Sequence, residues 1–394
     1  MTGTIRERSP GHFELRAFNV ATGKQVTRTY VHPRGERGVG IRAARAELAR
    51  LVTDVANGAH GGEKATLGQL LDEWIRFSEK ARERSPTTIA GYRGKVKRIK
   101  AGKLGQAGVA KLTGKDLDDF YLELKLEGLS PSSVHHYHRV LRAALNQGVK
   151  WGWLQANVAA KATVPSAPAP EMHVPSIEQA RALVVRAGET ASPDLGPILL
   201  FAMLTGVRRG ELCGIQWSDI DWAGQLVTIR RSIWQVRSTW GVKDPKTHQV
   251  RTVALDDVGM TLLRARRERA ELDAMMAGIE LSDDAYVWSA QPDGRTPRTP
   301  NSLSRAFHRL CRTMEAEAKT ADPPRTESWD FRLHDLRHWS AIQLVALGKD
   351  PRTVASRLGH SDPAITLRTY SHALEARDRD AAEALGRTLS PPSP

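Results

Sequence analysis

Two short stretches of small residues break this chain of 394 residues into three segments, so each segment must bury a core of its own. The first stretch, Gly58 to Gly62, is rich in glycine, and the second, Val164 to Pro170, mixes proline with alanine and serine. Both compositions are typical of linkers. The chain is also longer than one hydrophobic core usually serves. We predict domains at residues 1–60, 61–165 and 171–394.

The first segment has the alternation of a sheet followed by the spacing of a helix. Apolar side chains occupy every second position from Phe13 to Ala17, a turn follows at Ala21 to Lys24, and residues 26–31 resemble a second strand. From Ile41 to Ala56, apolar residues recur on one helical face. We expect a β-hairpin or a three-stranded sheet packed on one helix. Basic residues at its exposed positions would either enter a DNA groove or face solvent: Arg16, Lys24, Arg28, Arg34 and Arg37.

The other two segments are mainly helical. Helical patterns in the second segment cover residues 67–77 and 116–126 and begin at Ser85 and Ser130, where a proline follows each serine. In the third segment an apolar helix and three strand-like runs occupy residues 198–204, 226–229, 233–236 and 251–255. The expected fold class is therefore mainly α with small β-sheets (α+β).

The charge of the chain points to a polyanionic partner. Its formal net charge is +14 and its pI is near 10.0, a large excess for a protein that is merely basic and soluble. Nucleic acid is favoured over a membrane, because no apolar run approaches the length of a spanning helix and no signal peptide opens the chain. Cys213 and Cys311, the only cysteines, fit a reducing compartment. We expect a cytoplasmic protein of a bacterial host.

Three motifs near the C-terminus gather residues with complementary chemistry: Leu333 to His338, Leu358 to Ser361 and Thr369 to His372. A cation can bind a phosphate oxygen, an imidazole can carry a proton, and a phenol can act as an oxygen nucleophile. Such a set can break a phosphodiester through a covalent protein–phosphate link. Each element alone is unspecific, since a lone histidine is usually structural and a lone tyrosine usually packs in a core.

Two further motifs lie upstream. Thr205 to Leu212 sits where an apolar helix breaks, so Arg208 should point out from a rigid base and Glu211, one turn on, should hold it. A surface arginine–glutamate pair would explain these residues about as well. Pro245 to Thr247 lies between two strand-like segments, which puts Lys246 at the tip or edge of a hairpin.

The order and spacing of all these motifs resemble the tyrosine recombinases, and within them the phage-integrase branch. The resemblance covers residues 176–390 and extends less specifically to residues 66–160, which look like a SAM-like helical core-binding domain. Residues 1–60 are similar in layout to the small ββ(β)α arm-binding domain of integrases. The family implies a site-specific DNA recombinase that cuts and rejoins strands through a 3′-phosphotyrosyl intermediate and so integrates and excises a mobile element.

Two arginines match the pair that clamps the non-bridging oxygens of the scissile phosphate in this family. They are Arg208 and Arg337. Guanidinium groups suit this task because they stay charged and hold phosphate in a fork. Arg209 is the obvious rival for the first position, and the family pattern favours Arg208. Glu211 matches a supporting acidic position.

The remaining catalytic positions also have counterparts. Lys246 matches the lysine that protonates the departing 5′ oxygen, and His334 matches the general acid/base. His360 matches the donor of a hydrogen bond to the phosphate, and Tyr370 matches the nucleophile. His338 would support this site.

The resemblance also implies partners and excludes cofactors. The 3′-phosphotyrosyl bond conserves the energy of the bond broken, so neither a metal nor ATP is needed, and we find no motif for either. Double-stranded attachment-site DNA would be the substrate, bound by a homotetramer, with a bending factor or an excisionase as candidate accessory partners. The sparse apolar stripe of residues 373–385 would dock on a neighbouring protomer or pack in cis.

The sequence leaves other functions open. A recombinase that lost catalysis would be a DNA-binding regulator, but no member of the residue set is missing. A chromosome-dimer resolvase or a type IB topoisomerase shares the chemistry, and the additional N-terminal segment favours an integrase.

Overall fold

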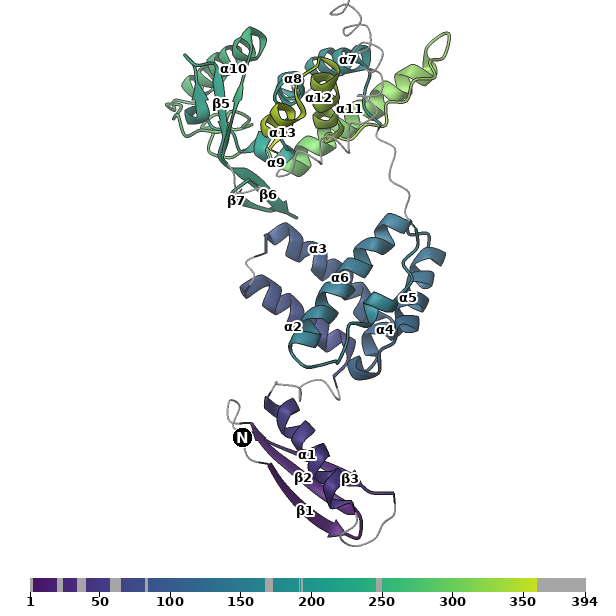
Figure 1. The fold of residues 1–394 in the computed structure, drawn as a ribbon. Coiled ribbons are helices and arrows are strands. Elements are labelled where there is room, and N and C mark those ends of the chain that lie inside the picture. The colour runs from purple at the N-terminus through teal and green to yellow at the C-terminus, as the bar shows by residue number, and fades with distance from the viewer. Residues whose placement is uncertain are drawn as a thin grey trace, which may run out of the picture. The chain divides into compact units, whose positions relative to one another are not determined.

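The computed structural model describes residues 3–19, 24–33, 40–56, 65–81, 84–166, 173–190, 192, 194–245 and 250–359. The chain separates into two compact units, Met1–Ala169 and Pro170–Pro394, which we describe one at a time (Figure 1). Both predicted linkers fall largely outside the described residues. No helix in the described parts of the chain is long and apolar enough to cross a membrane.

The chain begins with a small sheet covered by one helix (Figure 1). Strands β1 (Gly3–Ser9), β2 (His12–Asn19) and β3 (Lys24–Val31) form an antiparallel sheet in the order β1-β2-β3. Helix α1 (Ile41–Ala56) contributes Ala44 and Leu51 to a core with Phe13, Leu15 and Ala17 of β2. The three-stranded form of the prediction is therefore the correct one, and the helix has the predicted bounds.

The predicted basic face of this sheet is only partly correct. Arg28 pairs with Leu15 across the strands and thus lies on the side of the helix, where its Nη1 contacts the Glu47 Oε1 of α1 at 3.0 Å. Arg16 lies on the opposite, open face and forms an ion pair with Glu14. The side chains of Lys24, Arg34 and Arg37 lie outside the described residues.

The next part of the chain is a helical bundle. Its helices are α2 (Leu67–Lys80), α3 (Pro86–Ala101), α4 (Lys103–Gln106), α5 (Gly114–Leu126) and α6 (Pro131–Lys150), with 3₁₀ turns at η2 (Val109–Lys111) and η3 (Val158–Lys161). Serine or threonine caps four of the helices, at Thr66, Ser85, Thr113 and Ser130. The apolar stripes read from the sequence meet in one core that includes Leu70, Trp74 and Leu141.

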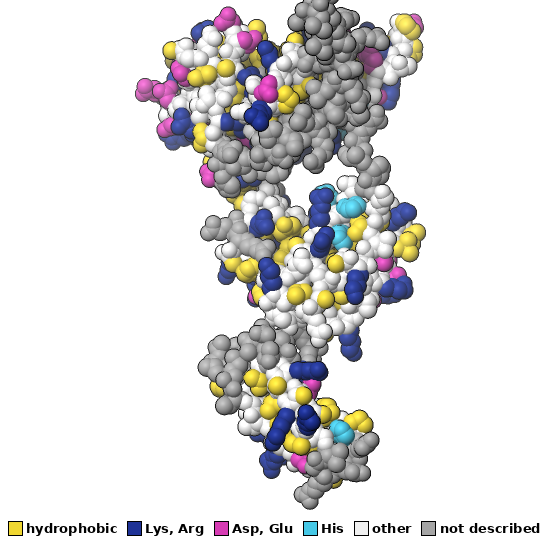
Figure 2. Space-filling view, in the orientation of Figure 1, with side chains coloured by type: hydrophobic (Ala, Val, Ile, Leu, Met, Phe, Trp, Pro, Cys, Tyr) yellow, Lys and Arg dark blue, Asp and Glu magenta, His cyan; other side chains and the backbone are white. Residues whose placement is uncertain are grey.

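Basic side chains gather on the face of this bundle seen in Figure 2. Helix α6 exposes His136 and Arg139, and Lys95 of α3 lies close enough to affect His136. Burial, followed by the charges of Lys95 and Arg139, lowers the pKa of His136. At the end of the bundle the chain is tied back, because His135 Nε2 lies 2.8 Å from the Pro165 carbonyl oxygen.

The second unit mixes helices with two small sheets. The helices are α7 (Ile177–Gly188), α8 (Leu195–Thr205), α9 (Arg209–Cys213), α10 (Asp257–Met276), α11 (Pro300–Thr320), α12 (Asp335–Ala346) and α13 (Pro351–Leu358), with a 3₁₀ turn at η4 (Trp217–Asp219). Strands β4 (Ile220–Asp221), β5 (Leu226–Ile229) and β8 (Arg251–Ala254) form one antiparallel sheet, and β6 (Ser232–Val236) pairs with β7 (Thr239–Lys243) in a hairpin. Helix α8, apolar on all sides, is buried in the centre of the core. The α+β fold class is confirmed.

The two strands on either side of Lys246 do not form a hairpin with each other, so Lys246 is not at a hairpin tip between them. Strand β7 ends at Lys243 and β8 begins at Arg251, but β7 pairs with β6 whereas β8 pairs with β5. The segment between them therefore joins two different sheets and closes no hairpin. The sequence has no clear pattern for β7, which is the true partner of β6. The turn of that hairpin lies at Arg237, where φ is +53°. Lys246 itself lies outside the described residues.

Candidate active site

Arg208 stands at the break between α8 and α9, as the sequence predicts. Helix α8 ends at Gly206, which adopts a left-handed conformation with φ +62° and is packed so closely that a side chain there would clash with Leu358. The chain then turns sharply into α9, and Arg208 immediately precedes that helix. Its side chain keeps 21% of its surface exposed. The tight glycine turn thus fixes the base from which the guanidinium projects.

Glu211 holds Arg208 as expected. The carboxylate is fully buried and accepts hydrogen bonds from Arg208 Nη1 at 2.9 Å and from the Arg208 backbone N–H at 3.0 Å. The second guanidinium nitrogen of Arg208, Nη2, donates to the Gly359 carbonyl oxygen at 2.6 Å. Burial alone would raise the pKa of Glu211, but the hydrogen bonds and charges of Arg251 and Arg208 lower it overall. Glu211 is therefore an anion.

Arg337 is delivered to the same place by α12. Its side chain is buried, and its Nη1 donates to the Gly206 carbonyl oxygen at 2.7 Å. Gly206 lies two residues before Arg208, so both arginines are anchored on one turn of backbone. Figure 1 shows α8, α9, α12 and α13 gathered in this part of the unit. The structure thus brings together the two arginines proposed to bind phosphate.

His334 lies at the start of α12, one turn before Arg337. The residue keeps solvent access, but desolvation of its ring, followed by the charges of His338 and Arg337, lowers the pKa of His334 to about 4. Arg208 contributes to the same shift, which places it near the ring. The rings of His334 and His338 meet edge to face with centroids 4.8 Å apart. At neutral pH the imidazole is therefore uncharged and reachable.

Arg209, the rival of Arg208, has a different environment. Its Nη1 donates to Ser304 Oγ of α11 at 2.7 Å. Together with α11 and the segment before α12 it lines a cavity of about 720 Å³ that reaches His334. The other basic side chains of this groove are Arg305, His308, Arg309 and Arg332. The groove extends the positive charge of the site along one side of α11.

Three predicted site residues, Lys246, His360 and Tyr370, lie outside the described residues. The structure does describe Gly359, the residue before His360, which ends α13 in a left-handed conformation with φ +70°.

Sequence reasoning missed Arg251 in the neighbourhood of the site. Arg251 begins β8, and its Nη2 donates to Glu211 Oε2 at 2.6 Å. Its signal in the sequence was weak, because a single arginine in a predicted strand usually faces solvent. A basic residue beside an otherwise apolar strand run was the one available clue.

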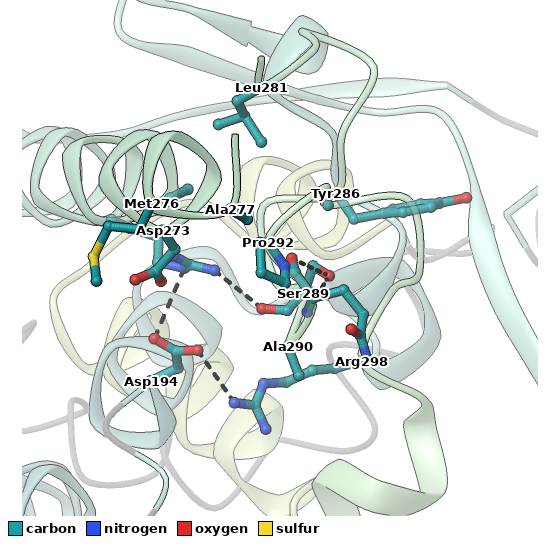
Figure 3. A pocket seen from close by; sticks show the side chains of 14 residues that line it. Asp194, Asp273, Met276, Ala277, Leu281, Tyr286, Ser289, Ala290, Pro292 and Arg298 are labelled. Atoms are coloured by element: carbon teal, nitrogen blue, oxygen red, sulfur yellow. Dashed lines mark hydrogen bonds and ion pairs between the residues drawn. The ribbon is translucent and has the colours of Figure 1, made fainter. Parts of the chain in front are cut away.

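A second cavity, of about 460 Å³, is lined by none of Arg208, His334 and Arg337, the predicted site residues that the structure describes. Figure 3 shows Asp194 and Arg298 joined on one side of it. The Asp194 carboxylate lies 3.1 Å from Arg298 Nη2 and 3.8 Å from Arg266 Nε. The charged side chains that line this cavity therefore largely neutralise one another. Among the described residues, no group of three or more histidine, cysteine, aspartate or glutamate side chains is placed to hold a metal ion.

Comparison with known proteins gives the family. The model of the phage integrase family matches residues 178–377, half of the chain. A XerC-like tyrosine recombinase of Caldanaerobacter subterraneus is 26% identical, over 93% of this chain and 97% of its own length. The ICEBs1 integrase of Bacillus subtilis is 28% identical over 48% of this chain and 47% of its own.

Solved structures share the fold. The Tn1549 transposon integrase, in complex with a circular intermediate DNA, superimposes with a TM-score of 0.68 at 18% identity, over 82% of this chain and 99% of that one. A λ integrase tetramer bound to a Holliday junction gives a TM-score of 0.56 at 19% identity, over 93% and 94%. The chain belongs to the phage integrase family and is a tyrosine-type site-specific recombinase that cleaves and rejoins DNA strands.

Proposed function

We propose that Arg208 and Arg337 clamp the scissile phosphate of an attachment-site DNA while Tyr370 attacks it. The attack forms a 3′-phosphotyrosyl bond and releases a 5′ hydroxyl, which leaves with a proton from Lys246. A 5′ hydroxyl from another strand then reverses the step, so that a mobile element is integrated or excised. The observation that carries this proposal is the anchoring of both arginines on the Gly206 turn, next to His334.

The electrostatics of the site suit this reaction. The transition state concentrates negative charge on the equatorial phosphate oxygens, and two fixed guanidinium groups stabilise it without a change in their own protonation. A phenol is largely protonated at neutral pH, so the attack needs a proton acceptor. His334 is neutral there and can accept that proton. His360 would donate a hydrogen bond to the same phosphate.

The other parts of the chain would bind DNA outside the cleavage point. We assign residues 1–60 to arm-type sites, residues 61–165 to the core site, where the basic face with Lys95, His136 and Arg139 supports the assignment, and residues 171–394 to catalysis. The Tn1549 and λ integrases were solved with DNA, and the latter as a tetramer. A homotetramer on DNA is proposed by that analogy. A bending factor or an excisionase as accessory partner is a separate proposal, which rests on the family resemblance of the sequence alone. Location in the cytoplasm of a bacterial host stays a prediction.

The direct test is covalent capture. Purified full-length protein is mixed with a nicked duplex that carries the attachment site, found as the repeat bordering the integrated element. We expect a protein–DNA adduct on a denaturing gel, and none with Tyr370→Phe. Adduct formation by Tyr370→Phe would assign the nucleophile elsewhere. Tight binding of the wild type without any adduct would favour the non-catalytic regulator.

Deletion of residues 1–60 tests the division of labour. The truncated protein should still cleave isolated core sites but should no longer integrate a full attachment site. Integration at the wild-type level by the truncated protein would contradict the assignment of this segment.

A further inference from the structure

Arg251 is a nearly buried arginine that joins three separate segments of the catalytic unit. Its side chain keeps only 9% of its surface exposed. Besides the bond to Glu211, its Nε donates to the Arg357 carbonyl oxygen, near the end of α13, at 3.0 Å. Arg251 therefore links the start of β8 to α9 and to α13.

These contacts close a ring of hydrogen bonds with Arg208. Arg208 donates to Glu211 and to the Gly359 carbonyl oxygen, and Arg251 donates to Glu211 and to the Arg357 carbonyl oxygen. Each side of the ring thus bridges the same two segments, α9 and the end of α13. A shift of either segment would break bonds of both arginines.

Gly359 brings the backbone against the Arg251 guanidinium. A Cβ on Gly359 would lie 2.9 Å from Arg251 Nη1 and 3.0 Å from its Cζ, closer than side chains tolerate. The left-handed φ of +70° also favours glycine there. The guanidinium therefore packs on the turn whose carbonyl oxygen accepts from Arg208.

Stability alone is a poor reason for this residue. Arg251 Nη1 is buried and has no hydrogen-bond partner among the described residues. Buried ion pairs that leave a donor unsatisfied seldom stabilise a fold more than apolar residues of the same size would. What the two fixed bonds do provide is orientation, because the planar fork of an arginine holds two acceptors at set angles.

We propose that Arg251 is a positioning residue, which fixes the Arg208 guanidinium and the Gly359 turn relative to each other without contacting DNA. The inference rests on the proposed role of Arg208 at the scissile phosphate. Arg251 follows the Lys246 segment and Gly359 precedes His360 in sequence. One buried side chain would thus set the place of Arg208 and constrain the chain next to two other proposed catalytic residues.

The test measures single-turnover cleavage of the nicked attachment-site duplex by the full-length protein at saturating DNA. Arg251→Met should slow cleavage roughly 10²-fold, the cost of misplacing a catalytic group by about 1 Å, with an unchanged Kd for the DNA. Arg251→Lys should fall between wild type and Arg251→Met, because one ammonium cannot hold both acceptors in a fork. The lysine variant also carries the test if the methionine variant unfolds.

Arg231→Met is the matched control. Arg231 has the same kind of environment in the same unit, because its Nη1 contacts the buried Asp219 at 2.8 Å and the Gly214 carbonyl oxygen at 3.4 Å. Of the proposed catalytic residues that the structure describes, Arg208, His334 and Arg337, it bonds to none. The Arg231→Met variant should cleave DNA at the wild-type rate at temperatures below its unfolding temperature. Equal rates for Arg251→Lys, Arg251→Met and this control would overturn the proposal.

A double-mutant cycle shows whether Arg251 works through Arg208. If it does, the variant with both Arg208→Met and Arg251→Met should be no slower than Arg208→Met alone. Multiplied losses would mean that Arg251 acts independently, which contradicts the proposal. A wild-type rate for Arg208→Met by itself would instead refute the proposed function on which the inference rests.

Discussion

Two clusters in the catalytic unit share the same ingredients, one carboxylate between two arginines, yet they differ in what the arginines hold. Glu211, with no exposed surface, bonds Arg208 and Arg251 through both oxygens. Asp194, with 21% exposed, bonds Arg298 at 3.1 Å and has Arg266 at 3.8 Å. The Glu211 cluster bridges the segments that frame the proposed phosphate site, whereas the Asp194 cluster lines a separate cavity. The difference indicates that placement, more than composition, makes an ion-pair cluster functional.

Glu211→Gln should have the largest effect, because it removes the carboxylate charge that lies between Arg208 and Arg251, two largely buried cations. We expect a loss of about 3–5 kcal/mol in the free energy of unfolding, as when one partner of a buried ion pair is deleted. Cleavage should fall by roughly 10²- to 10³-fold even at temperatures where the variant is folded, since Arg208 loses its support. Denaturant unfolding and single-turnover cleavage measure the two effects. If the folded variant cleaved DNA at the wild-type rate, the Glu211 cluster would not be needed to position Arg208 for cleavage.

Asp194→Asn makes the equivalent change in the other cluster. Arg266 and Arg298 would lose the charge of their carboxylate partner, which should lower the free energy of unfolding by about 1–3 kcal/mol. The rate of cleavage should stay at the wild-type value, because neither arginine bound by Asp194 contacts Arg208, His334 or Arg337, the proposed catalytic residues that the structure describes. Slow cleavage by a folded Asp194→Asn variant would mean that the Asp194 cluster, like the Glu211 cluster, contributes to the reaction.

His338→Ala sharpens the account of His334 by removing one cause of its lowered pKa. NMR titration of labelled histidine, assigned with His334→Gln, should give a midpoint near 4 for wild-type His334 and a higher one in the variant. Because the native pKa lies below the ordinary 6.5, the unfolded chain takes up its proton first as the pH falls. The stability that the neutral ring contributes is therefore complete above pH 6.5 and is lost as the pH drops towards 4. A native midpoint at 6.5 would contradict a neutral, desolvated ring.

Arg209→Ala should have the smallest effect. Arg209 bonds to Ser304 at the edge of the groove and not to the Glu211 cluster. We expect a change of no more than about 0.5 kcal/mol in the free energy of unfolding and wild-type cleavage at saturating DNA. Loss of cleavage on the scale of Arg208→Met would instead show that the two neighbouring arginines exchange roles.

Much of this fold could be predicted from the sequence because its elements have clear periodicity. The helix at residues 41–56 and the strand at residues 226–229 have the predicted bounds, and capping serines before proline marked two helix starts. Strand β7 escaped notice because its five residues carry a glycine and a lysine. Arg28, expected at an exposed position, is instead half-buried beside Glu47 of the helix, and pairing across elements leaves no local pattern in the sequence.

The candidate site shows the same division. The Arg208–Glu211 pair could be predicted because helical spacing brings residues three apart together. The ring through Arg251 and the end of α13 could not, since it joins positions more than a hundred residues apart through backbone oxygens, which every residue has. Motif order located the chemistry, and only the tertiary structure revealed what holds Arg208 in place.

Charge rescue at the scissile phosphate tests the central claim most directly. A methylphosphonate in place of that phosphate removes the negative charge that Arg208 and Arg337 are proposed to neutralise. We predict that Arg208→Ala, nearly inactive on the ordinary phosphate, regains much of its cleavage on the methylphosphonate, whereas Tyr370→Phe stays inactive on both. If Arg208→Ala were equally slow on the charged and the neutral substrate, the guanidinium would not act on phosphate charge and the account would be wrong.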